Sequence, residues 1–338
     1  MMDSIYLWGL EVIGFFQRFQ SPALTFLMQL VSFFSDPAFY FGLVLLLYWC
    51  FDSHAGFRLG VSIIFSGALN TAIKETLRIP RPFVRDPSVF MIEESGFSTP
   101  SGHSQGSATF YPLFAHLMLG SRHCRKCLHG KKDCDGRKIP LCVVGKLLVA
   151  VAIPLLIGFS RIYLGVHYPS DVLLGLTVGF LTSIAFILFW NPLAAMVGKW
   201  RPSLQLLLTA VLVVVLNHFS RGHIELGGVL LGFLVGRIFW SRRGGYWSAQ
   251  GTLVQRLLRL PLGAVVVAAV FYVTEWLAAL LIEVAAGLSP AMNLASLLDF
   301  ARFAIAGFLV VYLCPVVFVR LGLAMAEPVA TDDAGVQQ

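Results

Sequence analysis

Three short segments of this chain carry residues whose types suit phosphate chemistry. They span 74–82, 100–103 and 160–171, and each lies at the end of an apolar run. Their chemically active residues are Lys74, Arg81, Ser101, His103, Arg161, His167 and Asp171. Ionisable residues are costly near a bilayer, and where they occur there they usually mark a function. We therefore expect these cations, imidazoles, hydroxyl and carboxylate to form one phosphate-handling site.

Lys74 and Arg81 lie seven residues apart, which places them on one face of a continuous helix. Pro80 and Pro82 instead predict that the helix ends before Arg81, leaving this arginine in the loop beyond. The two cations suit an anionic substrate. Taken alone, they also fit ordinary snorkelling side chains at the end of a membrane span.

Pro100-Ser101-Gly102-His103 stands at the start of a further apolar run. Serine is a good N-cap, and the free N–H groups of a first helical turn bind phosphate oxygens. Gly102 lets the backbone approach a ligand closely, and His103 projects into the same space. Taken alone, this segment is also compatible with a capped helix that binds nothing.

His167 and Asp171 are four residues apart, and Pro169 suits a helix start between them. A carboxylate that accepts one imidazole N–H fixes the tautomer and leaves the other nitrogen free as a nucleophile. Arg161 offers a planar fork for bidentate phosphate binding. A structural His–Asp pair at a helix end is the alternative interpretation of this segment alone.

Together, the three segments resemble the signature of the type 2 phosphatidic acid phosphatase superfamily. That signature is Lys-x6-Arg-Pro, Pro-Ser-Gly-His and Ser-Arg-x5-His-x3-Asp, and every named position is filled here in order. The resemblance covers about residues 55–190. It implies that the phosphoryl group is bound by Lys74, Arg81, Ser101, Gly102 and Arg161. It also implies that His167 attacks phosphorus to form a phosphohistidine, that Asp171 orients His167, and that His103 acts as acid and then as base.

The assignment of the two histidines agrees with their spacing. Only His167 has a carboxylate at helix spacing, which leaves His103 for acid–base work. Fixed cations supply electrostatic stabilisation, and the sequence shows no carboxylate cluster suited to Mg²⁺. We therefore expect neither a metal nor another cofactor at this site.

Composition predicts an integral membrane protein. Of the 338 residues 57% are hydrophobic and only 13% are charged, whereas soluble domains carry roughly a quarter charged residues. The mean hydropathy is +0.78. Apolar runs long enough, or nearly long enough, to cross a bilayer are about nine in number: 37–51, 56–77, 103–121, 142–160, 169–190, 203–218, 223–240, 262–285 and 298–321. We therefore expect an all-α, polytopic membrane helix bundle.

The predicted organisation has three parts. Residues 1–190 form the phosphatase core, residues 191–323 add further transmembrane helices, and residues 324–338 form a disordered tail. Within the core, residues 3–18 lack the basic leader and the cleavage site of a signal peptide, so we expect an amphipathic helix in the membrane interface.

The distribution of basic residues predicts which side the site faces. Five alternate loops hold 17 of the 25 Lys and Arg residues, and the positive-inside rule makes these loops cytoplasmic. The motif segments then face the other side, which in a bacterial inner membrane is the periplasm. The net charge of +7 mostly reflects these loops, so we expect membrane lipids and no nucleic acid as partners.

A basic insertion at 121–140 contains three cysteines and two histidines, and Cys142 follows it. One interpretation is a cytoplasmic loop with incidental cysteines, and the other is a structural metal site. In the later spans, Glu275 needs a partner or a proton, and Glu283 and Arg302 are candidates to pair with each other.

The position of the motifs favours a lipid phosphate or diphosphate as substrate, such as phosphatidate, phosphatidylglycerophosphate or an isoprenoid diphosphate. A sugar phosphate is the alternative, because glucose-6-phosphatases belong to the same superfamily and share a nine-span layout. Vanadium haloperoxidases carry the same motifs but are soluble. A silent binding protein would be expected to lose His103 or His167. The sequence makes no prediction of oligomeric state.

Overall fold

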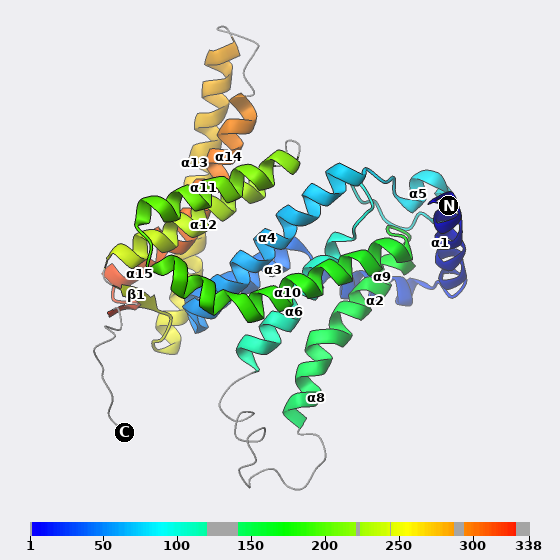
Figure 1. The fold of residues 1–338 in the computed structure, drawn as a ribbon, viewed down its shortest axis with the longest axis horizontal. Coiled ribbons are helices and arrows are strands. Elements are labelled where there is room, and N and C mark those ends of the chain that lie inside the picture. The colour runs from blue at the N-terminus through cyan, green and yellow to red at the C-terminus, as the bar shows by residue number, and fades with distance from the viewer. Residues whose placement is uncertain (1, 120–140, 221–223, 244, 287–293, 329–338) are drawn as a thin grey trace. The chain divides into compact units, whose positions relative to one another are not determined.

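The computed structural model describes residues 2–119, 141–220, 224–243, 245–286 and 294–328 (Figure 1). Within these ranges the chain is almost entirely helical and divides into two compact units. We call Met1–Gly42 with Phe65–Met196 the site unit, and Leu43–Ile64 with Val197–Gln338 the C-terminal unit. The division differs from the expected boundary at residue 190, because the segment 43–64 packs with the C-terminal helices.

The helices that lie wholly or partly in the site unit are α1 (Met2–Gln17), α2 (Pro22–Phe33), α3 (Pro37–Leu46), α4 (Ser53–Leu77), α5 (Pro82–Arg85), α6 (Gly102–Met118), α8 (Leu141–Leu147), α9 (Ile153–Tyr163) and α10 (Pro169–Gly198). A 3-10 turn, η2, occupies Pro87–Val89, and a π turn, η3, occupies Leu148–Ala152. Two serines cap these helices: Ser21 accepts the Leu24 N–H at 3.2 Å and Ser101 accepts the Ser104 N–H at 3.4 Å.

Two glycines let α10 lie directly against α6. A Cβ atom on Gly175 would come within 2.7 Å of the Ser101 carbonyl oxygen, and one on Gly179 would collide with the Gln105 carbonyl. Small residues four apart are a common means of close helix packing in membranes. Because of this approach the N-terminal ends of α6 and α10 meet, and the Ser101 N–H donates to the Asp171 carbonyl at 3.0 Å.

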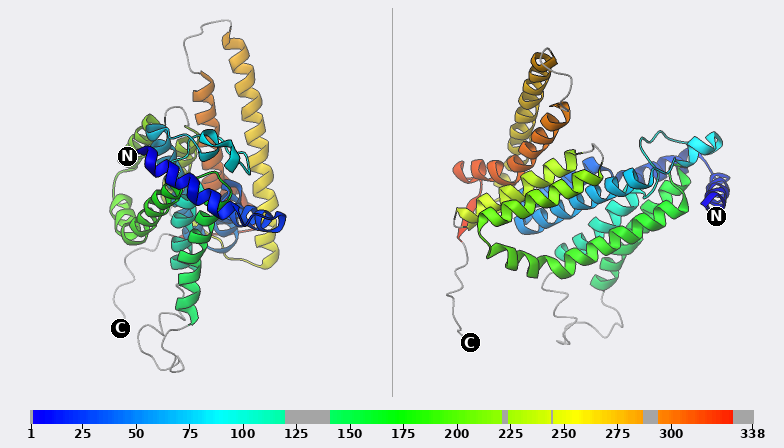
Figure 2. Two further views of the ribbon diagram at one scale, coloured as in Figure 1. Left: turned by 90° about the vertical axis from the view of Figure 1, so that its right-hand side faces the viewer. Right: turned by 45° about the horizontal axis from the view of Figure 1, so that its top comes forward.

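The C-terminal unit is built from π turn η1 (Leu47–Phe51), α11 (Pro202–Phe219), α12 (Glu225–Arg242), α13 (Leu253–Ala286), α14 (Leu294–Phe308), π turn η4 (Leu309–Leu313) and α15 (Cys314–Arg320), with strands β1 (Gly245–Ser248) and β2 (Met325–Pro328). The strands pair antiparallel. Helices α13 and α14 lie side by side in both views of Figure 2. Gly228 and Gly232 let α12 approach the backbone of α14.

Two of the π turns have a cause in the sequence. Turn η3 is followed by Pro154 and turn η4 by Pro315, each two residues after the end of the turn. Proline cannot donate a backbone hydrogen bond, and its ring crowds the carbonyl one turn earlier. A single π turn accommodates this defect without ending the helix.

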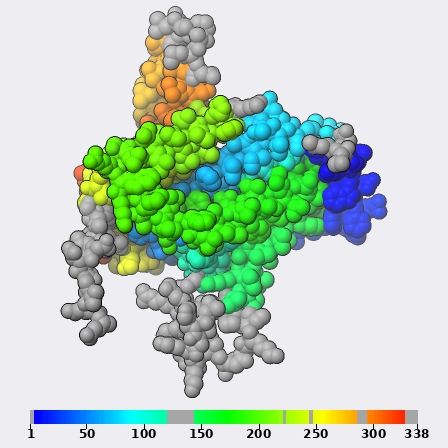
Figure 3. Space-filling view, in the orientation of Figure 1, coloured from blue at the N-terminus to red at the C-terminus, as the bar shows by residue number. Residues whose placement is uncertain are grey.

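The protein is an integral membrane protein, and six of its described helices are long and apolar enough to cross a membrane. The count is seven if α2 and α3 with η1, which are bent by 48°, form one span. The predicted number of nine is therefore not confirmed. In the site unit, α10 presents apolar side chains outward, including Leu173, Leu181 and Leu188; its green atoms cover much of the face in Figure 3.

Three smaller expectations can be compared with the structure. The tail was expected to be disordered from residue 324, but Met325–Pro328 form strand β2; residues 329–338 lie outside the described residues. The cysteine-containing insertion at 121–140 also lies outside them. Arg302 pairs with Glu275 at 3.4 Å and with Asp299 at 2.9 Å, so Glu275 has the partner that its position requires.

Candidate active site

Four helix ends of the site unit meet where the three motif segments converge: the C-terminal ends of α4 and α9 and the N-terminal ends of α6 and α10 (Figure 1). Each helix therefore contributes a terminal turn. The predicted residues occupy the last turn of α4 (Lys74), the N-cap of α5 (Arg81), the N-cap and first turn of α6 (Ser101, Gly102, His103), the last turn of α9 (Arg161), the following loop (His167) and the first turn of α10 (Asp171).

The connection from α4 to α6 brings the first two motifs together. Helix α4 ends at Leu77, and the next residue, Arg78, has a φ of +50°. The Ser98 N–H then donates to the Ile79 carbonyl at 2.8 Å. Lys74 donates from Nζ to the carbonyls of Phe97 and Ser98. The lysine is thus fixed against the segment that leads into the second motif.

The third motif turns sharply at Gly165, whose φ is +71°. A Cβ atom at this position would collide with the Val89 carbonyl, so both the backbone conformation and the space favour glycine. The turn separates the end of α9 from the start of α10. It directs His167 into the interior, where only 1% of the residue is exposed.

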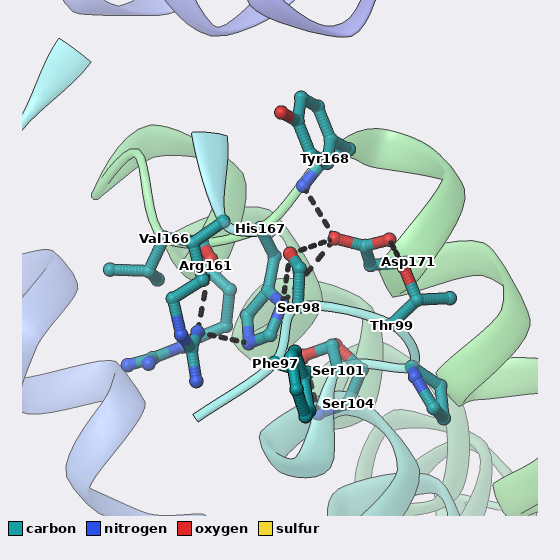
Figure 4. A network of polar contacts seen from close by, with 12 residues as sticks. Phe97, Ser98, Thr99, Ser101, Ser104, Arg161, Val166, His167, Tyr168 and Asp171 are labelled. Carbon is teal, nitrogen blue, oxygen red and sulfur yellow. Dashed lines mark hydrogen bonds and ion pairs between the residues drawn. The ribbon is translucent and has the colours of Figure 1, made fainter. Parts of the chain in front are cut away.

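Asp171 is fully buried and accepts three hydrogen bonds (Figure 4). The Ser98 hydroxyl and the Tyr168 N–H donate to Oδ2, the latter at 2.9 Å. The Thr99 hydroxyl donates to Oδ1. Hydrogen bonds to both oxygens stabilise the carboxylate and fix its plane.

His167 lies between Asp171 and Arg81. Its Nδ1 is 3.5 Å from Oδ2 of Asp171, and its Nε2 is 3.2 Å from Nη1 of Arg81. A guanidinium can only donate, so Nε2 must be the accepting, unprotonated nitrogen, and the proton of a neutral ring must sit on Nδ1 toward the carboxylate. The geometry therefore selects the tautomer whose lone pair lies on Nε2, where it accepts the hydrogen bond from Arg81.

Burial lowers the pKa of the His167 imidazole well below 6.5, and the cations of Lys74, Arg81 and Arg161 lower it further. A lowered pKa favours the neutral ring at neutral pH, in which Nε2 carries a lone pair and no proton. His167 can thus act as a nucleophile without first losing a proton.

The guanidinium of Arg81 is held by backbone carbonyls. Its Nε donates to Gly96 at 3.0 Å, Nη1 to Val166 at 3.1 Å and Nη2 to Ser95 at 2.6 Å. These three carbonyls hold the side chain in place. It brings a fixed positive charge to Nε2 of His167.

Arg161 is held by side chains instead. Its Nη1 donates to the Ser32 hydroxyl on α2 at 2.6 Å, and its Nη2 forms a short ion pair with Oε2 of Glu94. The imidazole of His103 interacts electrostatically with Arg161 and His167, as well as with the other two motif cations. The structure thus brings together the three cations and both histidines that the sequence predicts.

In the second motif, the predicted N-cap role of Ser101 is confirmed, whereas its phosphate binding is not tested. The Ser101 hydroxyl is fully buried, caps α6 and lies 2.9 Å from the Ser104 hydroxyl. A Cβ atom on Gly102 would lie 3.3 Å from Oδ1 of Asn70. Phosphate binding by Ser101 and Gly102 therefore stays a prediction. Among the described residues, no group of three or more His, Cys, Asp or Glu side chains is arranged to hold a metal ion.

Sequence reasoning missed four side chains of this site: Ser98, Thr99, Glu94 and Ser32. Ser98 and Thr99 directly precede the second motif, so extending that motif by two residues would have included them. Glu94 is an acidic residue between the first two motifs, which was a weak signal. Ser32 lies on α2, far from every motif, and nothing in the sequence indicated its role.

Two family models match the chain. The PAP2 superfamily model matches residues 55–195, and a model described as PAP2 superfamily phosphatase, transmembrane extension, matches residues 224–327. The first range contains all three motifs. The second covers most of the helices that hydropathy alone supported.

Several characterised proteins are similar to parts of this chain. Phosphatidylglycerophosphatase B of Bacillus subtilis (strain 168) is 35% identical over 118 residues, which cover 33% of this chain and 47% of that protein. A lipid A 1-phosphatase of Rhizobium johnstonii is 29% identical over 144 residues, covering 40% and 49%. Lipid phosphate phosphatase delta of Arabidopsis thaliana is 25% identical over 179 residues, covering 51% and 40%. The chain thus matches less than half the length of each relative.

Two solved structures are also similar. The crystal structure of a transmembrane PAP2-type phosphatidylglycerolphosphate phosphatase from Bacillus subtilis has a TM-score of 0.46 and 23% identity, covering 56% of this chain and 87% of that one. The crystal structure of Aquifex aeolicus LpxE has a TM-score of 0.41 and 21% identity, covering 53% and 93%.

Proposed function

The chain belongs to the PAP2 superfamily, and on this premise we propose that it is an integral-membrane phosphatase that hydrolyses a lipid phosphate or diphosphate through a phosphohistidine intermediate. The observation that carries the proposal is the placement of His167. Its Nδ1 faces a buried carboxylate and its Nε2 faces a cation. A neutral imidazole oriented in this way is an activated nucleophile.

The reaction then proceeds in two steps. Nε2 of His167 attacks phosphorus, the bond from phosphorus to the leaving oxygen breaks, and His103 protonates that oxygen. His103 next takes a proton from water, which attacks the phosphohistidine and releases inorganic phosphate and the free His167 ring. Lys74, Arg81 and Arg161 stabilise the negative charge on the phosphoryl oxygens in both steps. These fixed cations do the work of a metal ion, so hydrolysis proceeds without one.

Two features support a lipid substrate. The similar proteins named above are called phosphatases of phosphatidylglycerophosphate, lipid A and lipid phosphates. The site also lies at the ends of apolar helices, and Leu173 at the start of α10 is 67% exposed. A phosphorylated headgroup can therefore reach the site while its apolar chains stay in the bilayer.

We also propose that the site faces the periplasmic side of a bacterial inner membrane. The unequal distribution of basic residues supports this orientation. Helix α6 begins at the site and runs to Met118, and α9 returns to the site at Arg161. Within the site unit, the C-terminal end of α6 and the N-terminal end of α8 therefore point away from the site (Figure 1).

A phosphate-release assay on the full chain in detergent tests the activity. Phosphatidate, phosphatidylglycerophosphate, an isoprenoid diphosphate and glucose 6-phosphate are compared, with and without EDTA. We expect release from at least one lipid and survival of the activity in EDTA. Release from glucose 6-phosphate alone, or a requirement for added Mg²⁺, would contradict the proposal.

Cysteine labelling tests the orientation. Single cysteines replace Ser88 and Gly130 in a chain without native cysteines, and intact cells are treated with an impermeant maleimide. Position 88 should react from outside, and position 130 only after permeabilisation. The reverse pattern would place the site on the cytoplasmic side.

A further inference from the structure

A carboxylate of the protein forms ion pairs with two of the three cations that we expect to bind the substrate. Oε2 of Glu94 forms the short ion pair with Nη2 of Arg161, and Oε1 lies 3.7 Å from Nη2 of Arg81. Glu94 thus bridges the two guanidinium groups. In the free protein a single negative charge sits where a phosphoryl group is expected to bind.

Glu94 uses only part of the binding capacity of Arg161. The Nε–H and one Nη2–H of a guanidinium point to the same side and form a two-pronged donor that matches two oxygens of a phosphate. In this protein the Nη2 prong binds Glu94, whereas the buried Nε has no hydrogen-bond partner. Buried donors without partners are rare and call for an explanation. An oxygen of an arriving phosphate would provide the missing partner.

The cations are fixed, and the carboxylate is movable. The side chains of Arg81 and Arg161 are only 4% and 3% exposed, and carbonyls and Ser32 hold them. The Glu94 side chain is 28% exposed and lies in the loop before α6. A rotation of this side chain toward solvent would leave both guanidinium groups in place and open to a ligand.

We propose that Glu94 is a specificity-determining residue that reserves the Arg81–Arg161 pair for terminal phosphates and rejects phosphodiesters. This proposal rests on the phosphatase function argued above. A terminal phosphate carries a charge of about −1.5 to −2 at pH 7, whereas a phosphodiester carries one negative charge, as does the carboxylate. Glu94 is tethered beside the cations and therefore competes at a high effective concentration. Only the more highly charged ligand gains enough to displace it.

Such a device suits a site that opens toward a membrane. Most phospholipid headgroups are phosphodiesters, so they surround the site in large excess over any lipid with a terminal phosphate. An unoccupied pair of arginines would bind them as competitors. Specificity against an abundant competitor is often achieved by a repulsive element in the site, and the Glu94 carboxylate provides one.

The test compares two small anions that differ by one methyl ester. Methyl phosphate and dimethyl phosphate are used as inhibitors of lipid-phosphate hydrolysis by the wild type, Glu94→Gln and Glu93→Gln. Glu93 is the matched control, because it is adjacent, exposed and equally charged. We expect the inhibition constant of dimethyl phosphate, relative to that of methyl phosphate, to fall at least tenfold in E94Q and to change less than twofold in E93Q.

Two outcomes would overturn the proposal. One is an unchanged ratio in E94Q, and the other is weaker binding of both anions, which would mean that Glu94 only positions the arginines. Thermal unfolding with and without each anion gives the same comparison without turnover. It also shows whether E94Q is folded. Glu94→Asp serves as a second variant, for which we expect a ratio of the two inhibition constants between those of the wild type and E94Q. Absence of hydrolysis by the wild type would instead refute the proposed phosphatase function.

Discussion

Two buried arginines, Arg161 in the site unit and Arg259 in the C-terminal unit, are held by different kinds of partner. Arg259 in the C-terminal unit is fully buried. It donates only to backbone carbonyls, those of Trp49, Ala249, Gln250 and Leu323. Arg161 in the site unit is held by a serine and a glutamate and keeps one buried donor unused.

Three aromatic residues of the C-terminal unit follow the pattern of Arg259. Tyr48 and Trp240 donate to the Val311 carbonyl at 2.8 Å and 3.0 Å, and Trp49 donates to the Val310 carbonyl at 3.1 Å. Both carbonyls belong to π turn η4. These side chains donate hydrogen bonds to carbonyls that lack regular partners within the distorted helix. The contacts therefore stabilise the fold.

The comparison of Arg161 with Arg259 teaches that a buried guanidinium held by side chains can exchange a partner for a ligand, whereas Arg259, whose donors all bind carbonyls, cannot. Backbone carbonyls cannot leave without unfolding the segment, so Arg259 links β1, η1 and the segment before β2 permanently. Side-chain partners can exchange, so Arg161 can bind a phosphate without rearrangement of the backbone. We therefore expect variants of the site unit to lose activity and variants of the C-terminal unit to lose stability.

The largest expected effect is that of His167→Ala. Removing the nucleophile should lower turnover by about 10⁵-fold or more, while the unfolding midpoint stays close to that of the wild type. His218→Ala, in the last turn of α11, is the matched change in the C-terminal unit and should retain activity within twofold. Substantial turnover by the His167 variant would break the comparison and the mechanism together.

Asp171→Asn comes next. An amide cannot fix the imidazole tautomer or stabilise the ring's charge as a carboxylate does, so turnover should fall by about 10⁴-fold and leave measurable residual activity. Steady-state kinetics should show the loss in kcat, with KM nearly unchanged. A variant that lost substrate affinity instead would show that Asp171 acts through the phosphate-binding cations.

The two arginines give the sharpest contrast. Arg161→Ala should lower kcat/KM by about 10³-fold, as expected for the loss of a charge that stabilises the transition state, and should unfold at nearly the wild-type temperature. Arg259→Ala leaves several buried carbonyls unpaired and should cost about 3 kcal/mol or more of stability. Its folded fraction should retain full activity per molecule. Equal loss of activity in both variants would erase the proposed distinction.

The smallest expected effect concerns two buried serines. Ser98→Ala removes one donor to Asp171 and should lower kcat about tenfold, because the remaining donors Thr99 and Tyr168 still hold the carboxylate. Ser53→Ala removes a bond to the Trp247 carbonyl in the C-terminal unit. It should cost about 1 kcal/mol of stability and no activity. Paired measurements of kcat and the unfolding midpoint distinguish the two outcomes.

Sequence spacing predicted the candidate site largely because its main residues lie in three contiguous motifs. The residues that it missed are brought in by tertiary structure. Ser32 reaches Arg161 across 129 positions, and Glu94 has its role only because its loop folds back over the two arginines. No local pattern encodes such contacts.

The fold was predictable in class but not in number of spans. Hydropathy identified an all-α membrane protein, yet α6 and α12 are not among the described helices that meet the criteria of length and hydropathy for a span. Strand β2 was missed because its partner β1 lies about 80 residues earlier. The small, polar residues of the tail favour disorder locally, but pairing with a distant strand makes part of it a strand.

The most direct test of the central claim is to trap the covalent intermediate. His103→Ala removes both the acid of the first step and the base of the second. With a terminally radiolabelled isoprenoid diphosphate, whose phosphate leaving group needs less protonation than an alcohol, the phosphorylated enzyme should still form and should accumulate before a quench in alkali. The account predicts one labelled peptide, carrying phosphohistidine at His167, and none in the double variant that also lacks His167. Label on another residue, or turnover in the wild type with no labelled protein at any time, would contradict it.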